Sequence, residues 1–170
     1  MYDFHKSVVY QCYFKSFYDS NGDSVGDLRG VTAKLDYLQK LGVDYIWLNP
    51  FFPSPQRDNG YDVADYCAVD PRFGTMADFE ELAREAEKRG IRLMLDMVFN
   101  HTSTEHEWFQ KALAGDPDYE DYYIWREGGP DGTPPNNWES KFGGNAWQYV
   151  PEKGKWYLHL FDPTQADLNL

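Results

Sequence analysis

The chain has 170 residues, 16 Lys and Arg against 28 Asp and Glu for a formal net charge of −12, and two cysteines, Cys12 and Cys67. Nucleic-acid binding needs a basic face that releases phosphate counterions, and an anionic membrane surface repels an acidic chain. The charge therefore argues against both partners. No apolar stretch approaches the ~18 residues of a membrane span. Two distant thiols form neither a disulfide scaffold nor a C-x-x-C metal motif, so we expect one cytoplasmic domain, with or without an insertion.

The aromatic content is high: 6 Trp, 13 Tyr and 11 Phe make up 18% of the chain. Aromatic side chains bury large apolar areas and dominate many cores. The same side chains also form stacking surfaces for flat ligand faces such as sugar rings. Composition alone does not choose between an aromatic core and a carbohydrate-binding surface.

Apolar periodicity predicts three buried strands separated by two helices. Gly42 and Gly90 are expected to end the helices, and Thr75 to cap the second one, with Asp78 in the capping-box position. Short helix-to-strand turns and long strand-to-helix loops are typical of β/α barrels and of open doubly wound sheets. The strands are predicted over residues 8–14, 43–48 and 91–98, and the helices over 28–41 and 76–89.

Beyond His101 the character of the chain changes. Residues 102–170 are rich in Trp, Tyr, Gly, Pro and Asn; only 105–113 has helical spacing, and 156–161 has a strand pattern. These features predict a separate, irregular subdomain inserted after the third strand.

The loop over residues 19–27 carries oxygen-bearing side chains at alternate positions. These are Asp19, Asn21, Asp23 and Asp27, and the carbonyl of Val25 completes the series. A hard cation takes six to eight oxygen ligands, so the loop is interpreted as a Ca²⁺ site, with Mg²⁺ possible. The alternative is a polar turn held by its own hydrogen bonds.

Two further segments have the composition of a ligand site. In the loop after the second strand, Gly60 permits a sharp turn that presents Asp58 and Tyr61 in one direction. A carboxylate beside an aromatic ring suits a sugar, although D-N-G is also an ordinary turn. At the end of the third strand, Asp96 is costly to bury unless paired, and His101 lies where barrel sites form.

Several motifs in a fixed order resemble the α-amylase superfamily of glycoside hydrolases, and within it the oligo-1,6-glucosidase branch. GVDYIWLNP at 42–50 resembles the second-strand motif, and DMVFNH at 96–101 the D-x-x-x-N-H block. QADLN at 165–169 resembles Q-P-D-L-N, with Ala166 in place of Pro, and the loop at 19–27 matches the branch's metal loop. The likeness covers nearly the whole chain.

This resemblance implies a partial TIM (β/α) barrel, with residues 1–101 as the first β/α units of the catalytic A domain and 102–170 as an inserted B domain. It implies the N-terminal segment of a retaining α-glucosidase, an enzyme that cleaves trehalose 6-phosphate to glucose and glucose 6-phosphate. The alternatives are an α-glucosidase acting on isomalto- or malto-oligosaccharides, and a non-catalytic carbohydrate-binding fragment. The stretches that favour trehalose 6-phosphate are 54–56, 58–63, 95–103, 134–138, 141–147 and 158–161.

The resemblance also implies site residues. Asp58 would accept hydrogen bonds from sugar hydroxyls, Tyr61 would stack on the ring of the non-reducing glucose, and His101 would hydrogen-bond to the same glucose. Phe142, Phe161 and Gln165 would lie near the pocket from the inserted domain, and Asp96 would be structural within the site.

The family's nucleophile and general acid follow later barrel strands, whereas this chain provides three strands of eight. Retaining hydrolysis needs both carboxylates, so no residue here is predicted to be catalytic and the chain is expected to be inactive alone. The expected partner is a small saccharide. A partial barrel also leaves strand edges uncovered, so the rest of the barrel or self-association is expected to cover them.

Overall fold

The computed structural model describes residues 4–170. Within it the chain forms two compact units. The first unit runs to Pro53 and continues from Cys67 to Met97; the second comprises Ser54–Tyr66 and Val98–Leu170. The long loop that follows the second strand therefore belongs in part to the same unit as the C-terminal half of the chain.

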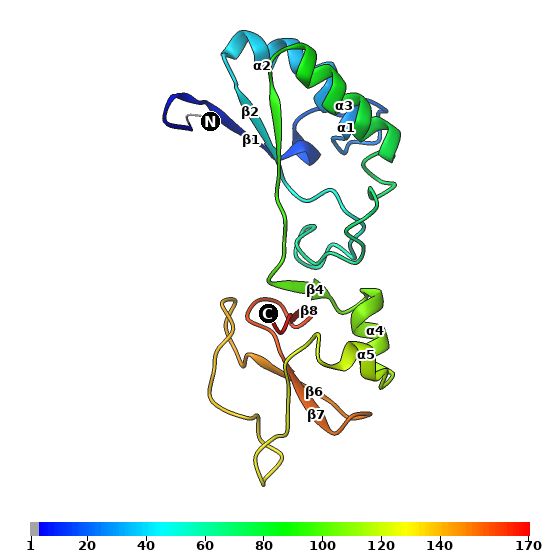
Figure 1. Ribbon diagram of the computed structural model, residues 1–170, viewed down its shortest axis with the longest axis vertical. Coiled ribbons are helices and arrows are strands. Elements are labelled where there is room, and N and C mark those ends of the chain that lie inside the picture. The colour runs from blue at the N-terminus through cyan, green and yellow to red at the C-terminus, as the bar shows by residue number, and fades with distance from the viewer. Residues whose placement is uncertain (1–3) are drawn as a thin grey trace. The chain divides into compact units, whose positions relative to one another are not determined.

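A three-stranded parallel sheet organises the first unit (Figure 1). The strand order is β1-β2-β3, and the register pairs Val9 with Tyr45 and Tyr45 with Arg92. The alternation of parallel strands and helices is that of the start of a β/α barrel, as predicted. The elements are β1 (Val9–Cys12), α1 (Leu28–Ala33), α2 (Leu35–Leu41), β2 (Tyr45–Leu48), α3 (Met76–Lys88) and β3 (Arg92–Leu95), with short 3-10 helices η1 (Phe4–Lys6) and η2 (Phe14–Ser16).

The first predicted helix is in fact two helices. Lys34 leaves helical geometry with φ −104° and ψ 7°, and it is both the C-cap of α1 and the N-cap of α2. Its ammonium group lies 4.0 Å from the centre of the Tyr18 ring, a cation–π contact. Gly42 ends α2 with φ +83°, the left-handed conformation that glycine adopts without a Cβ penalty.

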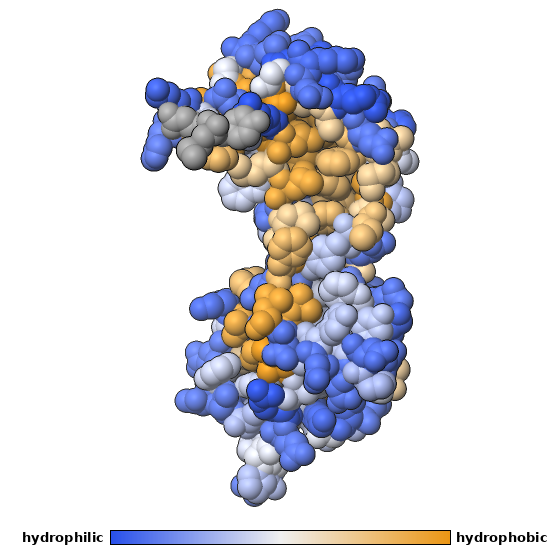
Figure 2. Space-filling view, in the orientation of Figure 1, coloured by the Kyte–Doolittle hydropathy of each residue, from blue (hydrophilic) through white to orange (hydrophobic). Residues whose placement is uncertain are grey.

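The core of the first unit lies between the sheet and its helices. Fully buried side chains from each layer meet there, and Figure 2 shows further apolar side chains gathered over the sheet. The residues of β3 are half-buried or exposed, whereas a parallel strand in a complete barrel is covered on both faces. The buried apolar residues include Phe14, Leu28, Val31, Leu35, Leu38, Ile46, Leu48 and Leu82.

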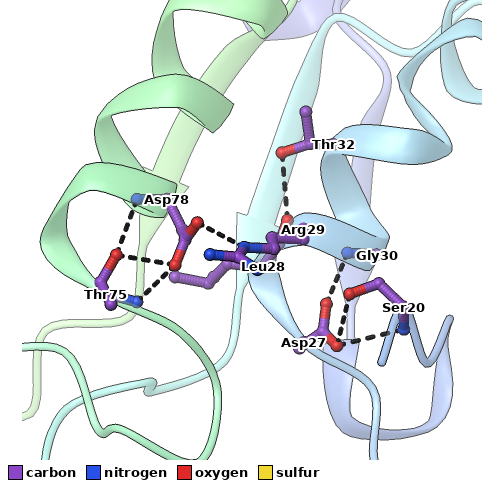
Figure 3. A network of polar contacts seen from close by, with 8 residues as sticks. All are labelled: Ser20, Asp27, Leu28, Arg29, Gly30, Thr32, Thr75 and Asp78. Carbon is purple, nitrogen blue, oxygen red and sulfur yellow. Dashed lines mark hydrogen bonds and ion pairs between the residues drawn. The ribbon is translucent and has the colours of Figure 1, made fainter. Parts of the chain in front are cut away.

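Polar contacts fix where the helices begin (Figure 3). Thr75 and Asp78 form the predicted capping box at the start of α3. Asp78 also accepts a 2.6 Å hydrogen bond from Arg29, which ties α3 to α1. The buried Asp27 caps α1 by accepting from the Gly30 nitrogen at 2.6 Å. A Cβ on Gly30 would lie 1.9 Å from the Tyr18 carbonyl oxygen, so this approach requires glycine.

The second unit contains two small antiparallel sheets and two short helices. In one sheet, β4 pairs with β8 and His101 stands opposite Asp167; in the other, the order is β5-β7-β6. The predicted strand at 156–161 ends earlier, at Leu158. The elements are β4 (His101–Ser103), α4 (Glu107–Leu113), α5 (Pro117–Glu120), β5 (Trp125–Arg126), β6 (Trp147–Val150), β7 (Lys155–Leu158) and β8 (Gln165–Asp167).

An aromatic cluster forms the core of the second unit. The Phe109 ring lies 5.1 Å from Tyr123 and from Tyr157, and 5.8 Å from Trp125, centre to centre. All four side chains are buried. Part of the aromatic content is therefore structural. None of the helices described between residues 4 and 170 has the length and apolar character that crossing a lipid bilayer requires.

Candidate functional site

Four polar groups from distant segments of the second unit meet around His101. The Nε2 atom of His101 lies 3.0 Å from the Tyr61 carbonyl oxygen and 3.0 Å from Nε2 of Gln165. The Gln165 amide donates to Oδ2 of Asp58 at 2.9 Å. We call Asp58, Tyr61, His101 and Gln165 the Asp58 cluster. Residues more than 100 positions apart in the sequence are thus brought into one hydrogen-bonded group.

The neighbours of His101 decide its protonation state. Amide nitrogens lie 3.2 Å from Nδ1 (Asn100) and 3.0 Å from Nε2 (Gln165). The Tyr61 carbonyl accepts from Nε2 in the tautomer that carries the proton there. The side chain is 4% exposed. Burial lowers the pKa of His101 below its usual value, because desolvation outweighs the attraction of Asp58 and Asp62. Burial therefore favours the neutral imidazole.

Asp62 shapes the loop that carries Asp58 and Tyr61. Its carboxylate is fully buried and accepts from the Ser54 hydroxyl at 2.8 Å, the Arg57 nitrogen at 2.8 Å and the Asp58 nitrogen at 3.1 Å. The tight turn that follows has positive φ at its two central positions, Asn59 and Gly60. The sequence motif includes Asp62 but does not reveal its role, because a buried carboxylate is recognised only from its burial and its donors.

Two phenylalanines extend the cluster with apolar surface. The Phe161 ring lies 5.2 Å from His101 and 5.9 Å from Phe142, and Phe142 is 60% exposed. Ser140 holds both residues, because its hydroxyl donates to the Phe161 carbonyl at 2.7 Å and accepts from the Phe142 nitrogen at 3.1 Å. Sequence reasoning did not identify Ser140.

The structure brings together six of the seven predicted site residues within the second unit. Asp96 is the exception and belongs to the first unit, where it follows the end of β3 and its N–H donates to the Leu48 carbonyl at 3.2 Å. The six are Asp58, Tyr61, His101, Phe142, Phe161 and Gln165.

Two side chains hold the backbone around His101. The Tyr66 hydroxyl lies 2.7 Å from the carbonyl oxygens of both Val98 and His101. On the other side, Oδ1 of Asp167 accepts from the Asn100 amide at 3.1 Å and from the Leu160 nitrogen at 3.2 Å. Asp167 is 3% exposed, and burial raises its pKa to about 6. Tyr66 and Asp167 have no direct place in the cluster but fix its geometry.

The loop over 19–27 is folded by its own carboxylates. Asp19 accepts from the nitrogens of Asn21, Gly22 and Ser24, and these bonds lower its pKa. Asp23 accepts from the Val25 nitrogen at 2.8 Å. Asp27 is buried as the cap of α1.

The oxygen atoms of this loop are of the type that Ca²⁺ prefers. Among residues 4–170, however, no group of three or more His, Cys, Asp or Glu is arranged to hold a metal. A cation here would therefore depend on amide and carbonyl oxygens as well as on Asp19 and Asp23.

Comparison with known proteins assigns the chain to a family. A model described as the α-amylase catalytic domain matches residues 11–170. The chain belongs to the α-amylase family. Trehalose-6-phosphate hydrolase of Escherichia coli K12 is 62% identical to the chain, over 95% of the chain's length. Oligo-1,6-glucosidase of Heyndrickxia coagulans is 54% identical to it, over 96% of its length.

The solved structures agree. The crystal structure of Bacillus licheniformis trehalose-6-phosphate hydrolase superposes with a TM-score of 0.94 at 58% identity and covers 96% of this α-amylase family chain. The chain spans about 30% of the length of these relatives: 29% of the E. coli protein and 30% of the B. licheniformis chain.

Removing the hydroxyl of Tyr66 tests its positioning role. We expect Tyr66→Phe to lower the free energy of unfolding by about 1–2 kcal/mol, because the one hydroxyl that lies between the two carbonyl oxygens is lost. It should also shift the ring ¹⁵N resonances of His101, measured by NMR. Tyr122→Phe is the matched control, since Tyr122 is 40% exposed. An unchanged His101 spectrum in Tyr66→Phe would contradict the role.

Asp167 should give the stability of the chain a pH dependence. Its pKa is raised on folding from 3.8 to about 6, so the stability it contributes is present below pH 4 and is lost as the pH rises through 6. The unfolding free energy of the wild type minus that of Asp167→Asn should fall by about 2.4 kcal/mol between pH 4 and pH 7. Urea denaturation at both pH values measures this difference.

The lowered pKa of His101 makes the free energy of unfolding rise with pH, opposite to the effect of Asp167. The His101 contribution is present in the wild type and in Asp167→Asn, so it cancels when one unfolding free energy is subtracted from the other. Parallel stability curves for the wild type and Asp167→Asn would show that Asp167 does not titrate as described.

Proposed function

We propose that this chain forms the glucose-holding side of a retaining α-glucosidase active site, for which trehalose 6-phosphate is the substrate. The observation that carries the proposal is the Asp58 cluster with Phe161 beside it. Oδ2 of Asp58 is held by Gln165, so the carboxylate is oriented to accept sugar hydroxyls through its remaining lone pairs. Tyr61 stacks on the glucose ring, and His101 exchanges its bond to the Tyr61 carbonyl for one to a hydroxyl.

The identity of the relatives supports the choice of substrate. Proteins named trehalose-6-phosphate hydrolase are 62%, 58% and 56% identical to the chain, and proteins named oligo-1,6-glucosidase are 53–56% identical. Sequence identity therefore favours trehalose 6-phosphate by a narrow margin. An isomalto-oligosaccharide is the second candidate substrate, because the same cluster holds a terminal glucose whatever the leaving group.

The chain binds but does not hydrolyse under this proposal. Retaining hydrolysis uses a nucleophilic carboxylate and an acid about 5–5.5 Å apart. Asp58 is committed to Gln165 and to substrate hydroxyls, and the family resemblance gives Asp96 a structural role. We assign both catalytic groups to later strands of the barrel.

The proposal includes the domain assignment: residues 1–101 are the first β/α units of the barrel, and 102–170 are an inserted B domain. The half-buried residues of β3 support a further strand or a second copy of the chain covering that edge. A cytoplasmic location is supported by the thiol state of Cys12 and Cys67.

We also propose that the loop over residues 19–27 binds Ca²⁺, or Mg²⁺ in its place. The ligands are side-chain oxygens of four residues and one main-chain oxygen. Support comes from the backbone bonds that orient the Asp19 and Asp23 carboxylates within one tight loop. The proposed ligands are Asp19, Asn21, Asp23 and the Val25 carbonyl, with Asp27 as the fifth, whose carboxylate must give up bonds to Ser20 or Gly30 to join them.

Titration with glucose, trehalose 6-phosphate and isomaltose tests the saccharide site. The 170-residue chain should bind with a Kd of about 1 mM, or about −4 kcal/mol, without releasing glucose from either disaccharide. Asp58→Asn should weaken binding by about 1.5–3 kcal/mol, because charged hydrogen bonds are lost. Glu152→Gln, at an exposed position of the same unit, is the control. Equal affinities of wild type and Asp58→Asn would overturn the assignment.

Thermal unfolding in Ca²⁺ and in EDTA tests the metal site. At a concentration 100 times its Kd, Ca²⁺ should stabilise the wild type by about 2.7 kcal/mol. Asp23→Ala should remove this gain, whereas Glu80→Gln on the exposed face of α3 should keep it. Identical midpoints of the wild type in Ca²⁺ and EDTA would exclude a metal at this loop.

A further inference from the structure

The second unit contains a hollow that shares no residue with the Asp58 cluster. Its volume is about 320 Å³, the lower end of the range for small-molecule sites. We call it the Trp138 hollow. Its lining includes Ile124, Arg126, Asn136, Trp138, Trp147 and Leu158.

A rigid aromatic platform forms one side of the Trp138 hollow. Trp138 and Trp147 stack with ring centres 6.3 Å apart and planes 25° apart. Trp147 is 5% exposed and packs in an apolar group with Leu158, whereas Trp138 is 53% exposed. The buried indole supports the outer one, so Trp138 presents a flat apolar surface at little cost in side-chain entropy.

A pre-oriented amide lies beside this platform. The Oδ1 atom of Asn136 accepts from the Trp138 nitrogen at 3.0 Å and from the indole nitrogen of Trp147 at 2.8 Å. Both bonds use the oxygen and fix the plane of the amide. The two N–H donors of Asn136 are engaged in neither bond, and the residue is exposed, so they are accessible to a ligand.

Arg126 adds a second donor group to the hollow. Its Nη1 donates to the Trp125 carbonyl at 2.8 Å, which restrains the side chain, and a guanidinium carries five N–H donors in all. Asn136 and Arg126 both offer donors, so the complementary ligand has acceptor oxygens along its edge and a flat apolar face for Trp138. A pyranose ring has both features.

We propose that the Trp138 hollow is a second saccharide-binding site, which holds one pyranose ring against Trp138 with its hydroxyl oxygens on Asn136 and Arg126. The inference is independent of the glucosidase proposal, because no residue of the Asp58 cluster takes part. A second site would hold saccharide on the second unit whether or not the first site is occupied.

The test uses the 170-residue chain carrying Asp58→Asn, so that the first site is weakened while the hollow is intact. Methyl α-D-glucopyranoside is titrated while the indole N–H of Trp138 and the side-chain amide of Asn136 are followed by NMR. Both signals should shift saturably. Trp138→Ala should weaken binding about 3- to 10-fold, the range expected for loss of an aromatic stacking partner.

Asn136→Asp is the sharper variant, because a carboxylate keeps the two accepted bonds that order the indoles but has no N–H to donate. It should also weaken binding, with the Trp138 resonances of the unliganded protein little changed. Tyr149→Ala, which removes a 43% exposed aromatic outside the hollow, should bind as the parent does. Unchanged affinity in both Trp138→Ala and Asn136→Asp would overturn the proposal, as would shifts produced by inorganic phosphate but not by the glucoside.

Discussion

The candidate site depends on one buried carboxylate, that of Asp62. Burying an ionised carboxylate without partners costs several kcal/mol, and here three donors from Ser54, Arg57 and Asp58 surround it. The hydrogen bonds to this carboxylate close residues 54–62 into a tight loop that contains the turn at Asn59 and Gly60. In this arrangement Asp58 contacts Gln165, and the Tyr61 carbonyl contacts His101.

The same principle recurs wherever the chain changes direction. In the first unit, Asp27 and Asp78 are buried, and the carboxylate of each accepts a hydrogen bond from a backbone N–H at the start of a helix. Around the site, Asp167 ties β8 to Asn100 and to the segment that carries Phe161. The high acidic content is therefore not only a solvated surface, since several of these carboxylates serve as internal acceptors for N–H groups.

The aromatic residues divide between two roles that composition could not separate. The core of the second unit contains four aromatic rings, in which Phe109 packs edge to face with Tyr123 and Tyr157 and stacks on Trp125. Phe142 and Trp138 instead are more than half exposed, and each is backed by a second ring. A rigid, supported ring at the surface is costly in apolar exposure, which is why these two positions attract a functional interpretation.

The sequence by itself determined the strand and helix alternation, the capping box at Thr75 and the segments that carry the site, because these follow from local periodicity and motif order. It did not show the break at Lys34, the early ends of β3 and β7 or the grouping of residues 54–66 with the second unit. It also missed Tyr66, Ser140 and Asp167, whose roles lie in contacts to backbone atoms distant in sequence. Only the tertiary structure decided which acids are buried, which aromatics are exposed and which donors meet, because burial and hydrogen-bond partners are properties of chain segments brought together by folding.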